Sequence, residues 1–288
     1  MKHLVPLFFA MMLMMLWMSF GCSGKKTDDN PNDTLNVRID YQPVDTDIVP
    51  IDTLESILAE TPMPKAADEL FDDFLFNFIG NRKLQIERVK FPLPVIKGKQ
   101  TTMLTRKQWK MEQLFLKQGF YTMILDNEKQ LELSKDTTVN HVVVEKVQLD
   151  SKTVEQFVFN REEGLWMLTE INHDAMTQNS NAAFLDFYAR FATDSLFQVE
   201  SLGEPVKTTV PDPDDDFSMI DGEFYPEQWQ DFQPQVLPKG FLYTISYGQE
   251  LKKGKQKIFI IRGISNGLET EMTFQLKEGK WKLVKLLQ

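Results

Sequence analysis

The sequence is poor in the residues that build most catalytic and metal centres. Its 288 residues include one cysteine and three histidines. An intramolecular disulfide is therefore excluded, and few histidines are available as metal ligands. The GxSxG, HExxH and Gly-rich phosphate-loop motifs of nucleophilic, zinc and nucleotide sites are also absent from the sequence. We therefore expect no cofactor and no nucleophilic catalysis.

Positive charge is scarce as well. The chain carries 42 Asp and Glu against 32 Lys and Arg, a formal net charge of −10 at pH 7. This excess of acid disfavours nucleic acid as a partner. No dense Lys and Arg cluster is present that would hold the chain flat on an anionic membrane surface.

Long apolar runs are missing except at the N-terminus, where one extends from Leu4 to Phe20. This run is 17 residues long and contains Pro6, whereas a membrane-spanning helix needs about 20 apolar residues. A positively charged start, a short apolar run and small residues after it are typical of a signal peptide. We therefore predict that residues 1–21 are removed.

Cys22, the only cysteine, follows directly after this run and after the small residue Gly21. The arrangement resembles the lipobox of bacterial lipoproteins, although Ser19 stands where that motif usually has Leu. The resemblance implies lipidation of Cys22 by acyl chains such as palmitate, each buried methylene contributing about 0.8 kcal/mol to membrane binding. The expected location is the cell envelope, anchored to the outer membrane on its periplasmic or surface side.

The composition of residues 22–65 predicts a flexible tether that contains one short helix. Almost nothing apolar occurs from Ser23 to Asn36, so this stretch cannot offset the entropy of ordering. Further on, Asp52 or Thr53 can cap a helix, and Glu55 can complete the capping box.

An internal repeat with a period of about 115 residues is the most informative pattern in the chain. Seven residues recur unchanged 113 positions later: Phe71, Asp73, Phe74, Phe78, Gln85, Glu87 and Pro92 meet Phe184, Asp186, Phe187, Phe191, Gln198, Glu200 and Pro205. Further matches are Gln108-Trp109 with Gln228-Trp229, Gly119-Phe120 with Gly240-Phe241, and Glu163-Gly164 and Trp166 with Glu278-Gly279 and Trp281. We therefore predict two domains that share one fold, at 66–175 and 180–288.

Periodicity predicts the elements of this fold. Phe71, Phe74, Leu75 and Phe78 stand at the spacing of an amphipathic helix, and Asn81 and Asp194 are expected to cap a second, short helix in each copy. An alternating strand is expected over 89–93, and a helix over 105–117 that is weaker in the second copy. Antiparallel strands are expected over 119–125, 139–149, 153–159 and 165–171, and over 241–247, 257–264, 268–276 and 280–287. Helices followed by a meander of strands predict an α+β fold.

This order of elements, ending in a Trp-bearing strand, resembles the NTF2-like fold, in which a curved sheet wraps around helices to form a cone. With the lipoprotein leader, it also resembles a Bacteroidetes lipoprotein family that carries a domain of unknown function of the DUF4348 type. The resemblance implies two tandem NTF2-like domains. Because its motifs are packing motifs, it transfers no catalytic residue.

The candidate polar sites are few. Among the repeated carboxylates, Asp73 lies off the apolar helix stripe and Glu163 in a turn, which leaves Glu87 and Glu200 as the candidate catalytic bases. His141 and His173 have no counterpart in the other copy. An acidic stretch places Asp212, Asp214, Asp216 and Glu223 at positions 1, 3, 5 and 12 of an EF-hand-like loop, but Phe217 replaces the required Gly. A solvated insertion of the second copy, over 210–227, is the simpler interpretation.

Aromatic residues offer a further candidate site, since Trp109, Tyr121, Trp229 and Tyr243 could line a ligand pocket or could pack in the core.

Two function classes remain open. The first, which we favour because the repeated positions are packing positions, is a non-catalytic lipoprotein that binds a small molecule, glycan or protein. The second is a small pocket enzyme, a hydrolase or isomerase, with Glu87 or Glu200 as base. The enzyme requires an open cone and a desolvated carboxylate that faces another polar group.

Overall fold

The computed structural model of the chain describes residues 65–212, 214–249 and 254–288. These residues belong to one compact unit. The predicted signal peptide, Cys22 and the predicted helix of the tether lie outside the described residues. Within the described part, no helix has the length and apolar character needed to cross a membrane.

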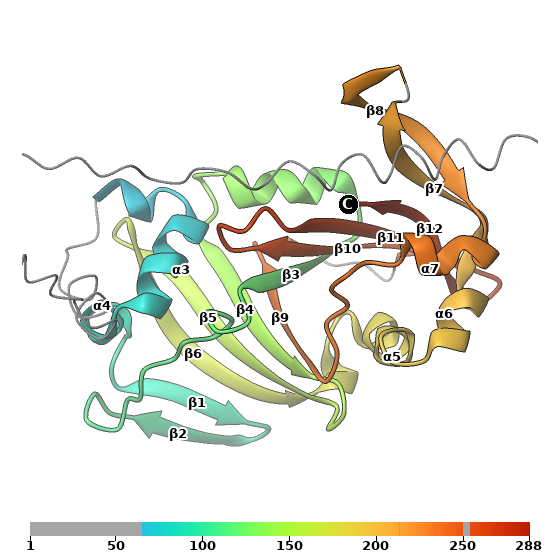
Figure 1. Cartoon of the computed structure of the whole chain (residues 1–288). Helices are drawn as coiled ribbons and strands as arrows, with labels where there is room; N and C mark the ends of the chain where they lie inside the picture. The colour runs from blue at the N-terminus through green and yellow to red at the C-terminus, as the bar shows by residue number, and fades with distance from the viewer. Residues whose placement is uncertain (1–64, 213, 250–253) are drawn as a thin grey trace, which may run out of the picture. The chain divides into compact units, whose positions relative to one another are not determined.

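Two α-helices followed by six strands occur twice along the described part of the chain, and the two series differ in the short helices between the strands (Figure 1). The first series is η1 (Lys65–Asp68), α3 (Phe71–Gly80), α4 (Arg82–Arg88), β1 (Leu93–Lys97), β2 (Gln100–Leu104), β3 (Phe120–Leu125), η2 (Glu128–Lys135), β4 (His141–Gln148), β5 (Thr153–Glu162) and β6 (Leu165–Ala175). The second is η3 (Met176–Gln178), α5 (Ala182–Phe191), α6 (Ser195–Glu200), β7 (Leu202–Asp212), β8 (Asp215–Phe224), η4 (Pro226–Gln228), α7 (Trp229–Phe232), β9 (Phe241–Ser246), β10 (Gln256–Gly263), β11 (Glu269–Lys277) and β12 (Lys280–Leu287).

Local sequence explains the helix starts and the tight turns. Asn81 accepts a hydrogen bond from the Leu84 amide at 3.0 Å, and Asp194 accepts one from the Phe197 amide at 3.0 Å. Both predicted N-caps are therefore confirmed. The turns before β6 and β12 place Gly164 and Gly279 at φ values of 84° and 77°, where a residue without Cβ is favoured.

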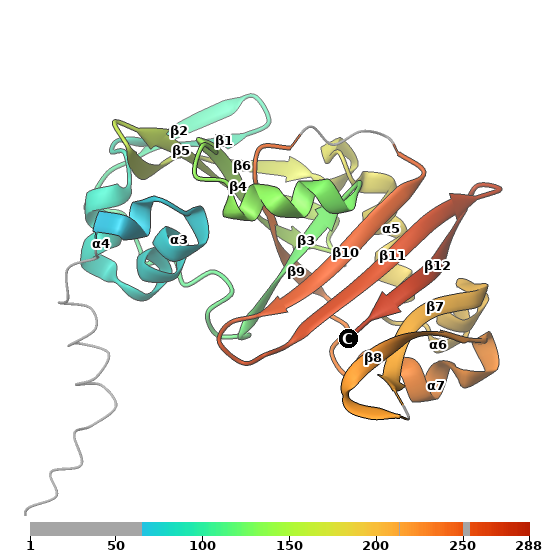
Figure 2. The same cartoon turned by 90° about the horizontal axis from the view of Figure 1, so that it is seen from above.

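All strands of the described residues join one 12-stranded sheet in the order β2-β1-β6-β5-β4-β9-β3-β10-β11-β12-β7-β8. Each half keeps its own strands except at the centre. There β4 pairs with β9 of the second half, and β10 pairs with β3 of the first half, both antiparallel. The two transferred strands meet in parallel where Thr122 faces Thr244 (Figure 2). The halves have thus exchanged equivalent strands.

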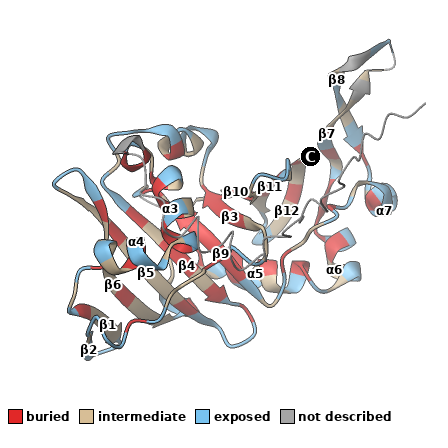
Figure 3. Ribbon diagram, turned by 60° about the vertical axis from the view of Figure 1, so that its left-hand side comes forward, coloured by how far each residue is buried: buried red, intermediate tan, exposed pale blue. Residues whose placement is uncertain are grey.

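The central strands are buried on both faces because each face carries its own core (Figure 3). On β3, Met123 and Leu125 pack into the core beneath α3, whereas the intervening Ile124 packs into the core beneath α5. This alternation follows from the two-residue period of a strand. Exchange of β3 and β9 therefore ties both cores to the same strands.

The α+β prediction and the eight strands predicted at 119–171 and 241–287 are confirmed, with small shifts at their ends. The strand expected over 89–93 is wrong, since β1 begins at Leu93 and Val89 makes only an isolated bridge. The insertion expected over 210–227 is mainly hairpin, because β7 and β8 are longer forms of β1 and β2.

The helix predicted over 105–117 is also wrong: this stretch consists of turns and extended backbone, and the second copy has the short helices instead. The side chain of Gln85 explains the difference. It accepts a hydrogen bond from the Glu112 amide at 3.0 Å and donates one to the Glu112 carbonyl at 2.7 Å. These are the backbone groups that a helix would have used internally.

Candidate functional site

The space between helices and sheet is closed at one end of the first copy. Asp68, which ends η1, makes a bidentate ion pair with Arg88, both distances being 2.8 Å, and accepts the Trp166 amide at 3.2 Å. Arg161 lies over the Trp166 ring at 5.0 Å and donates to the carbonyls of Asp68 and Glu69. Trp166 is consequently only 1% exposed. We call this arrangement the lid.

The second copy has no counterpart of the lid among the described residues. The positions equivalent to Asp68, Arg88 and Arg161 hold Asn181, Ser201 and Leu276, which cannot form the same ion pair. Asn181 instead accepts a hydrogen bond from the buried Lys257 ammonium at 2.6 Å. As a result Trp281, the equivalent of Trp166, remains half-exposed at the surface.

An open groove of about 1380 Å³ lies at this unlidded end. Aromatic rings form much of its lining: Phe184, Phe187, Phe197 and Trp281. Phe184 packs edge-on against Trp281 with ring centres 5.5 Å apart, and the Arg190 guanidinium lies 4.0 Å from the centre of the Phe197 ring. We call this cavity the aromatic groove. Flat apolar rings beside charged groups suit a ligand that has both an apolar face and polar substituents.

Charged side chains form the rim of the aromatic groove. Its basic residues are Arg190, Lys277, Lys280 and Lys282, and its acidic residues are Asp186, Glu200 and Glu278. Lys257 also lines the groove, but it is buried and paired with Asp126 at 2.6 Å. All three carboxylates are exposed, and Asp186 pairs with Lys152 at 2.8 Å. The groove thus combines aromatic surfaces with charged groups of both signs, which can bind and orient a ligand.

Comparison with known proteins places the chain in a family. The family model described as a domain of unknown function, DUF4348, matches residues 50–288. The chain belongs to the DUF4348 family. A crystal structure of an NTF2-like protein from Bacteroides fragilis is 39% identical to it, with a TM-score of 0.72 over 78% of this chain and 98% of that one. None of the curated proteins matches the chain.

These similarities confirm the predicted NTF2-like α+β fold of this DUF4348 protein. The fold is one that offers a pocket for a ligand or a substrate between its helices and sheet. The family description and the related structure name no ligand.

The structure places the two candidate bases of the DUF4348 protein on the surface. Glu87 lies on α4 and Glu200 at the end of α6, both exposed, and they belong to different halves of the chain. The Glu200 side chain lines the aromatic groove, while its backbone carbonyl accepts a hydrogen bond from Lys282 at 2.5 Å.

The four aromatic candidates lie inside the protein and not around one pocket. Trp109, Tyr121 and Tyr243 belong to the core beneath α3, and Trp229 belongs to the core beneath α5. Each Trp donates its indole N–H to a buried glutamine of its own half: Trp109 to Gln85 at 3.2 Å and Trp229 to Gln198 at 3.0 Å. Each glutamine in turn donates to the carbonyl that ends the preceding helix, Phe78 or Phe191. The two Trp residues are thus packing residues with satisfied N–H groups.

The EF-hand-like residues are spread along a hairpin instead of gathering around an ion. Asp212 faces Asp215 near the tip between β7 and β8, whereas Glu223 faces Lys207 farther down the ladder. Asp214 lies in the turn, where its amide bonds to the Asp212 side chain at 2.9 Å. The side chain of Asp216 lies outside the described part, and no group of three potential metal ligands occurs among the described residues.

The two histidines are also apart. His141 starts β4 and contacts Asn160 at 2.8 Å, while His173 lies on β6 within 3.7 Å of Glu155.

The sequence reasoning missed Asp72 and Glu145, two carboxylates whose pKa is raised by burial. Asp72 on α3 accepts hydrogen bonds from the Tyr247 hydroxyl at 2.5 Å and the Tyr121 hydroxyl at 3.2 Å. Burial raises the pKa of Asp72 above its ordinary value, although both phenols oppose this. The partner Tyr247 lies 175 residues away in the chain and reaches Asp72 only because β9 is exchanged. No local pattern could have shown this contact.

The second missed carboxylate is Glu145 on β4, which is 8% exposed. One of its oxygens, Oε1, accepts hydrogen bonds from Gln156 at 2.7 Å and Asn179 at 2.9 Å. Burial raises its pKa, and these two bonds oppose the rise. Its partner Asn179 lies 34 residues further along the chain, so local periodicity could not show the contact.

Proposed function

We propose that this DUF4348 protein is a non-catalytic binding lipoprotein of the bacterial cell envelope, and that the aromatic groove of its second half holds the ligand. The loss of the lid at Trp281 is the observation that carries this proposal. Equivalent aromatic residues are sealed by an ion pair in one half and left open in the other. Exposed apolar surface costs free energy, so an open aromatic site is best explained by a ligand that covers it.

The lining indicates the class of ligand. Rings of Phe187, Phe197 and Trp281 offer flat apolar surfaces, and the rim offers ammonium groups that donate hydrogen bonds. A sugar ring has one apolar face and many hydroxyl acceptors, which matches this distribution. We therefore propose a glycan as the ligand. We further propose that two tandem NTF2-like domains, 66–175 and 180–288, make up the binding protein.

The test is titration of the mature protein with a panel of oligosaccharides, followed by Trp fluorescence and calorimetry. Trp281→Ala should weaken any binding at least about tenfold, because aromatic contacts of this kind contribute on the order of 1 to 3 kcal/mol. Met103→Ala is the control, since Met103 is an exposed apolar residue on β2, far along the sheet order from the groove. Equal binding by both variants would contradict the proposed site.

The membrane anchor is proposed from Cys22 and has its own test. Cells grown with an alkyne analogue of palmitate should label the wild-type chain and leave Cys22→Ser unlabelled. The wild-type protein should sediment with membranes, and the variant should be released from them. A wild-type chain that carries no label would contradict the anchor without affecting the groove.

A further inference from the structure

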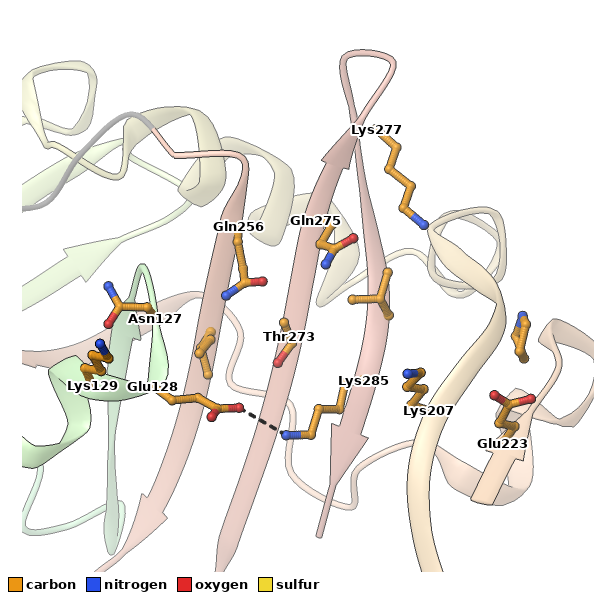
Figure 4. A pocket seen from close by; sticks show the side chains of 13 residues that line it. Asn127, Glu128, Lys129, Lys207, Glu223, Gln256, Thr273, Gln275, Lys277 and Lys285 are labelled. Carbon is orange, nitrogen blue, oxygen red and sulfur yellow. Dashed lines mark hydrogen bonds and ion pairs between the residues drawn. The ribbon is translucent and has the colours of Figure 1, made fainter. Parts of the chain in front are cut away.

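A second cavity, of about 990 Å³, lies on the other face of the same strands (Figure 4). Strand alternation separates it from the aromatic groove. On β11, Met272 and Phe274 point into the core beneath α5, whereas Thr273 and Gln275 point into this second cavity. The cavity's other wall is the segment that follows β3 and opens η2, with Asn127, Glu128 and Lys129. We call this cavity the lysine groove.

One continuous row of side chains crosses the floor of the lysine groove. Paired positions on neighbouring strands run from β10 to β8 in the order Ile258, Thr273, Lys285, Lys207 and Glu223. All five line the groove. Neighbouring strands are about 4.8 Å apart, so the groups at the centre of this row, a hydroxyl and two ammonium ions, are close enough to contact one ligand group together.

Two lysines are adjacent at the centre of this row, and Glu223 faces the second of them, Lys207. Lys285 and Lys207 are direct neighbours on β12 and β7, and like charges in such positions repel. Lys285 has acidic partners in Glu128 and Glu271, both at 3.4 Å. Lys207 has no ion pair within the described part of the chain. The lining as a whole has four lysines and two glutamates, although the chain has a net charge of −10.

Thr273 gives an independent indication of a ligand. It is 7% exposed, and its hydroxyl finds no hydrogen-bond partner among the described residues. A buried hydroxyl without a partner is costly. Its nearest cross-strand neighbours in the row are Ile258, which offers no side-chain acceptor, and Lys285, which offers only donors. An acceptor supplied from the groove would satisfy both the hydroxyl and the ammonium groups.

We infer that Thr273, Lys285 and Lys207 form a binding site for an oxyanion, a carboxylate or phosphate group, on a hydroxylated ligand. The three donors lie side by side on neighbouring strands of one face, and charge-assisted hydrogen bonds are the strong ones. The amides of Asn127, Gln256 and Gln275 extend along the groove and can bond the ligand's hydroxyls. This site is separate from the proposed glycan site and does not depend on it.

Calorimetric titration of the mature protein with D-glucuronate, glucose 6-phosphate and neutral glucose tests the site. Binding of at least one of the two anionic sugars, with glucose much weaker, is expected, and the stronger of the two identifies the oxyanion. Affinity should fall as salt is raised, because the attraction is between charges. Absence of binding by both anionic sugars at millimolar concentration, or equal binding of glucose, would overturn the inference.

Two substitutions separate a binding role from a structural one. Thr273→Val and Lys207→Gln should each weaken binding of the anionic sugar by about tenfold or more. Thr273→Val should not lower the melting temperature, because the hydroxyl has no partner to lose. Lys207→Gln should leave it nearly unchanged, because this variant loses the repulsion from Lys285 together with the attraction to Glu223 on the neighbouring strand. Trp281→Ala, on the other face, is the matched control and should bind the anionic sugar normally. Unchanged affinity in Lys207→Gln and Thr273→Val, or a lowered melting temperature in both, would refute the site.

Discussion

Gln85 and Gln198 occupy equivalent positions, and the buried side-chain amide of each connects a Trp to the preceding helix. Both accept the indole N–H of a Trp and donate to the carbonyl at the end of a helix. Gln85 additionally bonds both backbone groups of Glu112. The repeated Gln and Trp were visible in the sequence, but their contact was not, because they are separated by 24 and 31 residues in the two halves.

Loss of these amides should cost more in the first half than in the second. Gln85→Leu leaves four hydrogen bonds unmade, two of them buried and two partly buried, whereas Gln198→Leu leaves two buried ones unmade. With a cost of about 1 kcal/mol or more for each unsatisfied group, we expect destabilisation of roughly 3 to 5 kcal/mol and 2 to 3 kcal/mol, respectively. Urea denaturation of both variants measures the difference. Equal destabilisation would show that Glu112 is held by other contacts.

The pKa of Glu145 is raised by burial, and this predicts a pH-dependent stability. A carboxyl group whose pKa is higher in the folded state favours folding while it is protonated. That contribution is complete below the ordinary value of 4.5 and is lost as the pH rises through the folded-state pKa. Glu145→Gln keeps an oxygen that can accept from Gln156 and Asn179 and carries no charge.

The variant Glu145→Gln should therefore be more stable than the wild type at pH 8 and similar to it at pH 4. Urea denaturation at both pH values provides the measurement. Lower stability of the variant at pH 8 would show instead that the ionised carboxylate is stabilised in the folded protein.

At the scale of elements, the lid explains why equivalent helices and strands enclose Trp166 in the first half but leave the aromatic groove open at Trp281 in the second. The ion pair between Asp68 and Arg88 has side chains only 9% and 13% exposed. Removal of one partner from such a pair leaves a buried charge without compensation. The aromatic groove could be predicted only in part from the sequence. Most of its aromatic residues belong to the sequence repeat. The sequence does not show, however, that Arg88 and Arg161 both contact Asp68, so the effect of replacing these three residues in the second half could not be predicted.

Asp68→Ala should destabilise the protein by about 3 to 5 kcal/mol and expose Trp166 to solvent. Guanidinium denaturation and quenching of Trp fluorescence by acrylamide report the two effects. Glu162→Gln is the control, because its partner Lys90 and Glu162 itself are 57% and 40% exposed, and such a pair contributes at most about 1 kcal/mol. A loss of stability as small as that of the control would show that the ion pair does not hold the lid.

At the scale of the whole molecule, the exchange of β3 and β9 lies beyond what the sequence could predict. The residues of each strand alternate in the same way whether the strand pairs within its own half or with the other half. The pattern therefore fixed the strands at 120–125 and 241–246 nearly to the residue, but it contained no information on their partners. Pairing was decided by the packing of Tyr121 and Tyr247 around Asp72 and by the two cores that share the central strands.

The exchange predicts that the two halves cannot separate while folded. A protease site inserted between Gln178 and Asn179, after η3, allows the chain to be cut between the halves without cutting a strand. Each fragment would then keep one strand inside the other fragment's sheet: β3 beside β10, and β9 beside β4. The cut protein should elute as one species in native buffer and separate into two only in concentrated guanidinium. Because both cores would have to open together, calorimetry of the uncut chain should show a single unfolding transition. Separation of the fragments in native buffer would mean that each half can fold around its own strand.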